Sequence, residues 1–164
     1  MAHIRDMQGG DAEQVSQIYR DSWTRTYSGA FSASGLEIEL QKRFSEEKQT
    51  AEAENPDVIA LVAIENDAII GASSSSMDER NQAWIDRMHV LPSHQGKGIA
   101  DDLLTATLVK HSGLQSIALK VLQENDRAIA FYEKHGFSET ELIENDPKVG
   151  GVNCIIMSRT LPRS

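Results

Sequence analysis

The stretch that decides the fold of this chain runs Trp84-Ile85-Asp86-Arg87-Met88-His89-Val90-Leu91-Pro92-Ser93-His94-Gln95-Gly96-Lys97-Gly98-Ile99-Ala100. Its first part is typical of a β-strand, and a proline and two glycines then break the pattern. An amphipathic helix is expected to follow, from Ile99 to Ser112. The stretch therefore predicts a strand that passes through a glycine-bearing turn directly into a helix.

A turn of this kind is suited to hold an anion. The first turn of a helix leaves four backbone N–H groups unpaired, and the helix dipole adds positive potential there. Gly96 and Gly98 have no Cβ and Ala100 is small, so a bulky ligand can approach the backbone closely. Lys97 adds a positive charge. We therefore expect a phosphate or pyrophosphate cradle at this turn.

The spacing of the glycines narrows the choice of ligand. A nucleoside-triphosphate P-loop needs Ser or Thr after its lysine, and here Gly98 follows Lys97. A dinucleotide fingerprint needs a third glycine where Asp101 stands. A nucleotide-binding domain is therefore the weakest of the candidates. Judged by the glycines alone, a tight turn with no ligand stays an alternative.

The segments around this stretch alternate between strand and helix patterns. Strands are expected over 4–7, 58–64, 68–76, 83–90, 116–121, 137–141 and 152–161, and helices over 12–26, 36–53, 99–112 and 126–135. Three of the strands form an antiparallel meander, a β-α-β unit follows, and a hairpin closes the chain. This order predicts an α/β protein with a mixed sheet, folded as a single domain over residues 1–164.

Composition excludes several classes of function. The chain of 164 residues has 16 Lys and Arg against 25 Asp and Glu, a net charge of −9, so we expect no nucleic-acid partner. No apolar run is long enough to span a membrane, and the N-terminus lacks the pattern of a signal peptide. The single cysteine, Cys154, suits a reducing compartment, so we expect a cytoplasmic protein. We expect no metal.

Two motifs together resemble those of the GNAT superfamily of N-acyltransferases. Its acetyl-CoA-binding motif, [QR]-x-x-G-x-[GA], is matched by Gln95, Gly98 and Ala100. A second motif follows downstream as Leu119-x-Val121-x-x-x-Asn125-x-x-Ala128-x-x-Phe131-Tyr132-Glu133-Lys134-x-Gly136-Phe137. The resemblance runs from about residue 58 to the C-terminus. It implies the GNAT fold: a mixed, largely antiparallel sheet splayed into a V, with helices on both faces and the cofactor in the V.

The resemblance also implies roles for individual residues. Backbone groups of Met88, His89 and Val90 would bind the pantetheine arm and the acetyl carbonyl, and Asn125 would touch that arm. The pyrophosphate loop would comprise Gln95, Gly96, Lys97, Gly98, Ile99 and Ala100. Tyr132 corresponds to the tyrosine that protonates the leaving thiolate in many family members. A tyrosine within hydrogen-bond reach can supply that proton, although packing beside Phe131 is the plain alternative.

The resemblance assigns no base to deprotonate the amine, because Trp84 and Lys120 occupy the places where family members often carry a glutamate. Strand alternation predicts that Asp86 shares a sheet face with Trp84 and Met88, with His89 on the other face. Asp86 is therefore the candidate base, and pairing with Arg87 or solvent is the alternative.

In the family, the first helix forms one wall of the acceptor site. Trp23 and Tyr27 would then offer ring faces to a cationic amine, although a core stripe is the alternative for this helix.

The resemblance implies an N-acetyltransferase that moves an acetyl group from acetyl-CoA directly to a primary amine of a small molecule or peptide. The alternative is a CoA-binding regulatory module without catalysis, which the missing glutamate base keeps open. The identity of the acceptor is not readable, and a homodimer paired through the closing strands also stays open.

Overall fold

The structure is a computed structural model and describes residues 2–162. Its strands are β1 (His3–Asp6), β2 (Val58–Glu65), β3 (Ala68–Met77), β4 (Ala83–Val90), β5 (Ser116–Leu122), β6 (Ser138–Asp146) and β7 (Val152–Thr160). Its helices are α1 (Ala12–Tyr27), α2 (Ala33–Phe44), α3 (Glu46–Glu54), α4 (Ile99–Lys110) and α5 (Asp126–Lys134). Short 3-10 turns are η1 (Gly9–Asp11), η2 (Ser28–Ala30), η3 (Pro92–His94) and η4 (Pro147–Val149).

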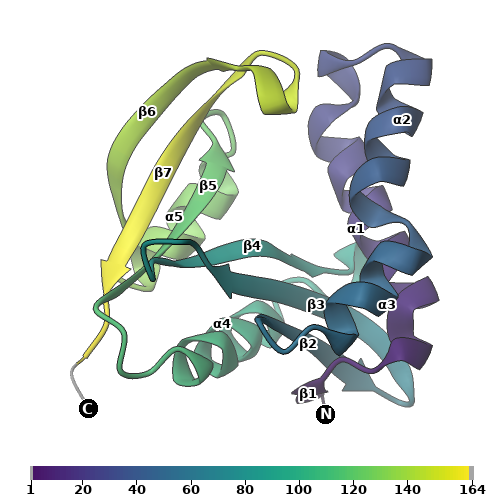
Figure 1. The fold of residues 1–164 in the computed structure, drawn as a ribbon, viewed down its shortest axis with the longest axis vertical. Coiled ribbons are helices and arrows are strands. Elements are labelled where there is room, and N and C mark those ends of the chain that lie inside the picture. The colour runs from purple at the N-terminus through teal and green to yellow at the C-terminus, as the bar shows by residue number, and fades with distance from the viewer. Residues whose placement is uncertain (1, 163–164) are drawn as a thin grey trace.

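The strands form one seven-stranded sheet in the order β1-β2-β3-β4-β5-β7-β6. Neighbours are antiparallel except β4 and β5, which run parallel and pair only at Ala83 with Ile117, Trp84 with Ala118 and Ile85 with Leu119. Beyond Ile85 the two strands part, and the sheet divides into two arms (Figure 1). The expected splayed, largely antiparallel sheet is confirmed.

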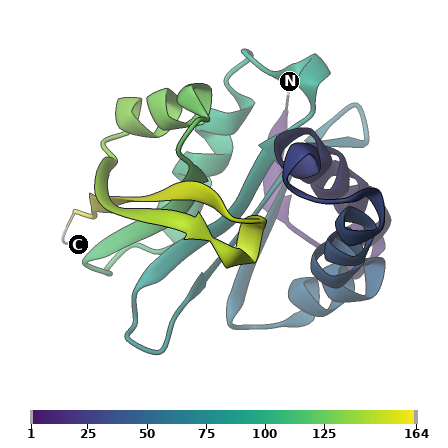
Figure 2. The same ribbon diagram turned by 90° about the horizontal axis from the view of Figure 1, so that it is seen from above.

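Helices cover both faces of the sheet. Ala72 of β3 packs in the apolar cluster that holds Val15 and Tyr19 of α1. The next residue, Ser73, faces the other way, and its Oγ lies 3.5 Å from Oγ1 of Thr107 in α4. Seen from above, α1–α3 lie at one side of the molecule and α4 and α5 at the other (Figure 2).

The helix expected over 36–53 is wrong in its bounds, because two helices occupy the segment. Ser45 has an extended ψ of 155°, which ends α2, and its hydroxyl accepts a hydrogen bond from the N–H of Lys48 to cap α3. Ser32 caps the start of α2 in the same way, through the N–H of Gly35. Serine competes well for the N-cap position, so it begins a new helix here rather than continuing the old one.

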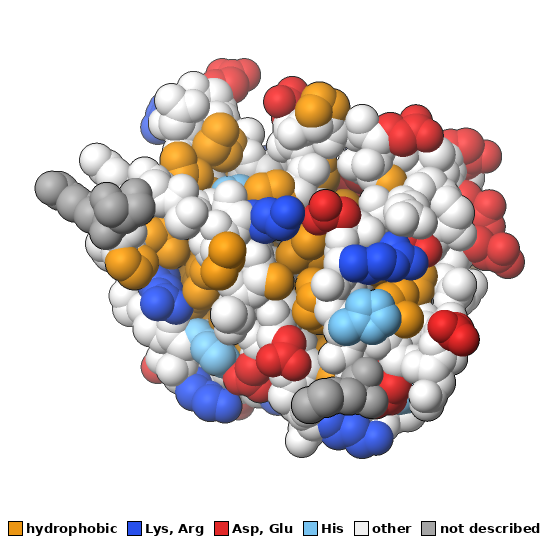
Figure 3. Space-filling view, turned by 90° about the horizontal axis from the view of Figure 1, so that it is seen from below, with side chains coloured by type: hydrophobic (Ala, Val, Ile, Leu, Met, Phe, Trp, Pro, Cys, Tyr) orange, Lys and Arg blue, Asp and Glu red, His pale blue; other side chains and the backbone are white. Residues whose placement is uncertain are grey.

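The surface mixes charges of both signs with apolar side chains (Figure 3). On the face seen in Figure 3, acidic side chains gather toward the side where α2 and α3 lie in Figure 1. The edge strand β6 exposes Glu139, Glu141 and Glu144, and repulsion between like charges disfavours pairing of this edge with a second copy of the chain. Within residues 2–162, no helix is long and apolar enough to cross a membrane.

Candidate active site

The splay between β4 and β5 opens a cleft of about 710 Å³. Because β5 leaves β4 after Ile85, the edge of β4 from Asp86 to Val90 has no strand partner on this side. A strand points its N–H and C=O groups alternately to its two edges, so the groups on this unpaired edge of β4 point into the cleft. Among the expected site residues, the lining includes Trp23, Tyr27, Asp86, Met88, His89, Val90, Gln95, Gly96, Gly98, Ala100, Asn125 and Tyr132, but not Lys97 or Ile99.

The turn before α4 presents free backbone donors. Gly96 and Gly98 have φ values of +79° and +82°, in the left-handed region that glycine adopts without a steric cost. Within the described part of the chain, no backbone N–H of residues 96–101 donates to another residue. A Cβ built at either glycine would meet no atom within 4 Å. The space beside the turn is therefore open, and its donors fit a diphosphate.

Two polar side chains predicted to contact the cofactor also support the walls of the cleft. The amide of Gln95 donates to the carbonyl oxygen of Val90 at 3.2 Å, which ties the turn to the end of β4. The Oδ1 atom of Asn125 accepts from the N–H of Ala128 at 3.1 Å and caps α5. The NH2 group of Asn125 makes no hydrogen bond to a described residue, so it is available to a ligand in the cleft.

A β-bulge in β4 changes which side chains face which layer. Ser74 pairs with Arg87 and Ser75 pairs with Ile85, so Asp86 is an extra residue in β4. Beyond the bulge the alternation is reversed, as a bulge requires. Met88 packs with the apolar clusters of α4 and α5, whereas His89 faces α1. The expectation that Asp86 and Met88 share a face, with His89 opposite, is therefore wrong.

Asp86 and Arg87 lie side by side where the two arms of the sheet part. The Oδ2 atom of Asp86 accepts from Oγ of Ser76 at 2.7 Å, and the carboxyl faces the open cleft. Protein surrounding this carboxyl removes part of its water and raises its pKa. Arg87 is held by both carboxylate oxygens of Glu52, and its buried Nε has no hydrogen-bond partner among the described residues.

His89 is a half-buried histidine that lines the cleft. Its Nδ1 lies 2.7 Å from Oγ of Ser22, and its ring meets the ring of Tyr19 edge-on at 5.6 Å. Burial lowers the pKa of His89 to about 4, with a further lowering from the charge of Arg87. The imidazole is therefore neutral at pH 7. The sequence assigned only the backbone of His89 to the site, and the bulge places its side chain there too.

Tyr132 lies in α5 against the inner wall of the cleft. Only 9% of the residue is exposed, and its ring contacts the rings of Phe131 and Phe137 at centroid distances of 5.2 and 5.5 Å. Its hydroxyl makes no hydrogen bond to a described residue. Burial raises the pKa of Tyr132 above that of an ordinary tyrosine, so this phenol holds its proton at neutral pH.

The aromatic residues of α1 serve the core as well as the cleft. Trp23 is 7% exposed, packs in the core with Phe31 and Phe44, and carries the guanidinium of Arg43 at 5.0 Å from its ring centroid. A cation already covers one face of Trp23, which favours the packing role for this residue. Tyr27 is half-buried against Trp23, and burial raises the pKa of its hydroxyl to about 12.

Comparison with known families shows which family the chain belongs to. Residues 12–137 match the family model described as the acetyltransferase (GNAT) family. The chain belongs to this family. The matched region contains the turn at 95–100, the splayed strands and Tyr132, so both motifs of the GNAT resemblance lie within it. This GNAT protein is an acetyltransferase that acts on an amine, and a non-catalytic CoA-binding module is not favoured.

Relatives of this GNAT chain carry the names of enzymes. Spermidine N(1)-acetyltransferase of Thermoplasma acidophilum is 29% identical over 140 residues, which cover 82% of this chain and 86% of the relative. N-alpha-acetyltransferase 30 of Schizosaccharomyces pombe is 33% identical over 84 residues, covering 48% and 56%. The crystal structure of a PaiA N-acetyltransferase from T. acidophilum with coenzyme A superposes with a TM-score of 0.78 and 26% identity, over 98% of this chain and 99% of that one.

The sequence of this GNAT enzyme did not reveal the cations that line its cleft. Arg25, Arg43, Arg87 and Lys120 come from α1, α2, β4 and β5, and no motif connects them. Only the folded arrangement of these four elements brings the side chains to one cavity. Among residues 2–162, no group of three or more His, Cys, Asp or Glu residues is placed to hold a metal ion.

Proposed function

We propose that this GNAT enzyme binds acetyl-CoA in the cleft between β4 and β5 and transfers the acetyl group directly to a primary amine of a small molecule or peptide. The observation that carries the proposal is that the glycine turn, the open edge of β4 and Tyr132 all line one cavity. Coenzyme A in the crystal structure of the PaiA relative supports it.

Different residues of the cleft bind different parts of the cofactor. The N–H groups of residues 96–101 receive the diphosphate, and the exposed side chain of Lys97 adds charge beside them. The free edge of β4 at Met88–Val90 holds the pantetheine arm as an extra strand would be held, and Asn125 donates to the same arm. When bound, acetyl-CoA supplies an activated thioester carbonyl.

Tyr132 acts as the general acid in this proposal. It lines the cleft, and its hydroxyl keeps its proton because burial raises its pKa. The same apolar surroundings disfavour a free thiolate, so they raise the proton affinity of a departing sulfur as well. Proton donation by Tyr132 to that sulfur releases coenzyme A as a thiol, and the phenol oxygen regains a proton from the amine nitrogen as the amide forms.

Asp86 is the proposed proton acceptor. An amine attacks only in its neutral form, and an amine with a pKa near 10.4 is almost entirely protonated at pH 7. The carboxyl of Asp86 faces the cleft, and its raised pKa makes it a stronger base than an ordinary aspartate. Ser76 holds the carboxyl in place through its hydroxyl.

Two measurements test the proposal. Calorimetry with coenzyme A, ATP and NAD should show binding of coenzyme A alone, because the turn lacks the features of a P-loop or a dinucleotide fingerprint. Release of free thiol from acetyl-CoA should then depend on an added amine. Preference for ATP or NAD would refute the assigned cofactor, and binding of coenzyme A without amine-dependent thiol release would refute the transfer.

A further inference from the structure

Charged side chains line both sides of the cleft. The glycine turn and α5 lie on one side, where the lining contains Arg127, Lys134 and Asp101, and Asp101 pairs with His135 at 2.7 Å and with Lys134 at 3.4 Å. On the side covered by α1 and α2, the lining contains the four cations Arg25, Arg43, Arg87 and Lys120. Asp86 is the one Asp or Glu that lines this side within the described chain. The side left for the acceptor is therefore rich in cations, although the whole chain has a charge of −9.

Carboxylates behind the lining hold three of these cations in position. The Nε atom of Arg43 lies 2.8 Å from Glu39, and Nζ of Lys120 lies 2.5 Å from Asp146. Arg87 is paired with Glu52. None of the three carboxylate residues lines the cleft, whereas all three cations do. Arg43 also donates to the carbonyl oxygen of Lys148. Each of the three cations is thus held in place and still has N–H groups outside these contacts.

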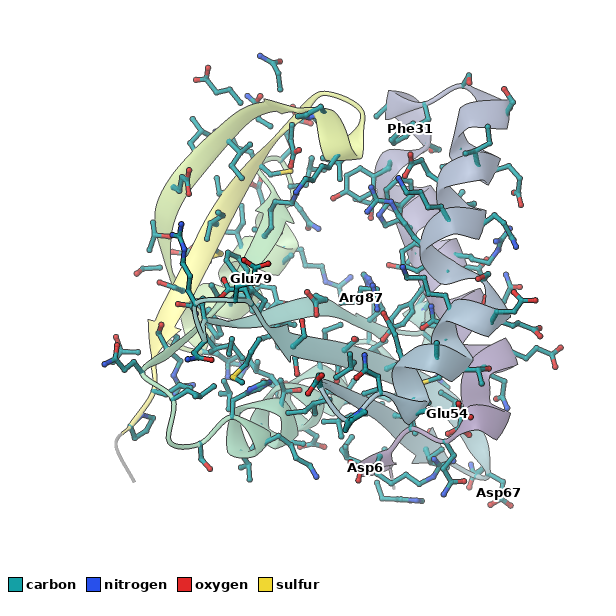
Figure 4. All side chains as sticks on the ribbon, viewed as in Figure 1. Asp6, Phe31, Glu54, Asp67, Glu79 and Arg87 are labelled. Atoms are coloured by element: carbon teal, nitrogen blue, oxygen red, sulfur yellow. The ribbon has the colours of Figure 1, made fainter. Side chains whose placement is uncertain are left out.

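Arg87 and Arg25 show that donors remain unused. The guanidinium of Arg87 lies 5.2 Å from the ring centroid of Tyr19 and 5.8 Å from that of Phe44, and its buried Nε has no partner in residues 2–162. Arg87 lies between the arm of the sheet formed by β5 and β7 and the helices α1 and α2 (Figure 4). Arg25 is exposed at the cleft and forms no ion pair with a described residue. Guanidinium groups match carboxylates in geometry and charge.

We propose that the amine acetylated by this enzyme also carries a carboxylate. Arg43 and Lys120 bind this carboxylate, and Arg25 and Arg87 add positive electrostatic potential around it. This substrate class rests on the proposed function above, because it assumes that acetyl-CoA occupies the other side of the cleft. A polyamine such as spermidine, the acceptor in the name of one relative, carries no carboxylate to accept hydrogen bonds from these side chains, and Arg25, which is not ion-paired to a described residue, repels its positive charges.

Matched acceptor pairs test the proposal. Thiol release is measured with lysine and cadaverine, with 4-aminobutyrate and butylamine, and with alanine and alaninamide, together with spermidine. Phosphoethanolamine and ethanolamine distinguish a phosphate from a carboxylate. The member of each pair with the extra carboxylate should have a kcat/KM higher by about tenfold or more, the effect of one charge-assisted hydrogen bond. Preference for spermidine, for phosphoethanolamine or for the members without that carboxylate overturns the proposal, whereas a panel in which no amine reacts refutes the proposed transfer itself.

Substitution of the cations tests whether they cause the preference for an acceptor with a carboxylate. Arg43→Gln should lower the carboxylate preference about tenfold, chiefly through KM for the acceptor. Because Arg43 also packs on Trp23, Lys120→Gln serves as a second variant with the same expectation. Arg20→Gln is the matched control, since Arg20 is ion-paired to Glu37 at 2.7 Å but does not line the cleft. An unchanged preference in both cleft variants overturns the proposal. Loss of coenzyme A binding by the wild type would refute the proposed function instead.

Discussion

The Oγ atom of Ser22 lies 2.7 Å from Nδ1 of His89, and this hydrogen bond joins α1 to β4 beside the cleft. The imidazole also packs edge-on against Tyr19, so the first helix and the splayed strand share a partly buried polar contact. Such a contact couples the stability of the fold to pH, because a histidine that has lost much of its water resists protonation.

The first prediction concerns this histidine. The pKa of His89 is lowered to about 4 in the folded protein from 6.5, so the unfolded chain binds the extra proton between these values. The contribution of His89 to stability is therefore present above pH 6.5 and is lost as pH falls toward 4, by about 3 kcal/mol in total. Urea unfolding from pH 4 to 7 should show this slope in the wild type and a much smaller one in His89→Asn. Ser22→Ala should keep the slope, because burial rather than Ser22 lowers the pKa. An equal slope in His89→Asn would contradict the assignment.

The second prediction tests the glycine turn. Gly98→Ala puts a Cβ on a residue with φ of +82°, which costs about 1–2 kcal/mol, although no atom lies within 4 Å of that Cβ. We expect the turn to shift and the Kd for coenzyme A to rise about tenfold. Gly10→Ala is the control, since its Cβ also meets nothing and its φ is not in the left-handed region. Calorimetry measures both, and equal affinities in the two variants would refute a role for the turn.

The third prediction concerns Tyr132. Tyr132→Phe removes only the hydroxyl, so the ring should keep its contacts with Phe131 and Phe137. Loss of a general acid should lower kcat by about 10²-fold or more while the Kd for coenzyme A stays near that of the wild type. Tyr19→Phe is the control, because Tyr19 is also buried but does not line the cleft. A kcat unaffected by Tyr132→Phe would exclude this residue as the acid.

The fourth prediction concerns Asp86. A base must be ionised, so kcat/KM should fall as pH falls through the raised pKa of Asp86, at a higher pH than an ordinary aspartate would give. Asp86→Asn should abolish this acidic limb and lower the rate by about 10²-fold. Asp78→Asn, which alters a carboxylate bonded to Trp84 outside the cleft lining, should keep the limb. If Asp86→Asn kept the acidic limb of the pH profile, the base would be another residue.

The fifth prediction concerns the contact between the loop after η4 and the turn η2, near Phe31 in Figure 4. A Cβ at Gly150 would lie 2.9 Å from both Cβ and the carbonyl oxygen of Ala30, whereas a Cβ at Gly151 would meet nothing within 4 Å. Both glycines have positive φ values, +77° and +82°, so both alanine variants bear the backbone cost. Gly150→Ala should lose about 1–3 kcal/mol more stability in urea unfolding than Gly151→Ala. Equal losses would show that the loops separate freely.

Much of the fold could be predicted from local patterns. The strand 83–90 and the turn before α4 were expected at their observed places, because proline and paired glycines mark chain reversal strongly. The break at Ser45 was missed, since the apolar spacing of Leu36, Leu40 and Phe44 continues toward it without a Gly or Pro. A serine that caps a new helix is locally hard to distinguish from a serine within one.

The site could be predicted only in part. The turn and Tyr132 belong to motifs that are continuous in sequence, and they line the same cleft. The bulge at Asp86 depends on the pairing of β4 with β3, so strand alternation alone placed Met88 and His89 on the wrong faces. The cations of the acceptor side come from four elements, and only tertiary structure brings them together.

The central claim is that the backbone of residues 96–101 holds the diphosphate of coenzyme A and leaves its sulfur beside Tyr132. A crystal structure of the protein with coenzyme A tests this most directly. The account predicts diphosphate oxygens within hydrogen-bond distance of the N–H groups at Gly96 and Gly98, and the sulfur within hydrogen-bond reach of the Tyr132 hydroxyl. Coenzyme A bound outside the cleft between β4 and β5, or with its sulfur remote from Tyr132, would contradict it.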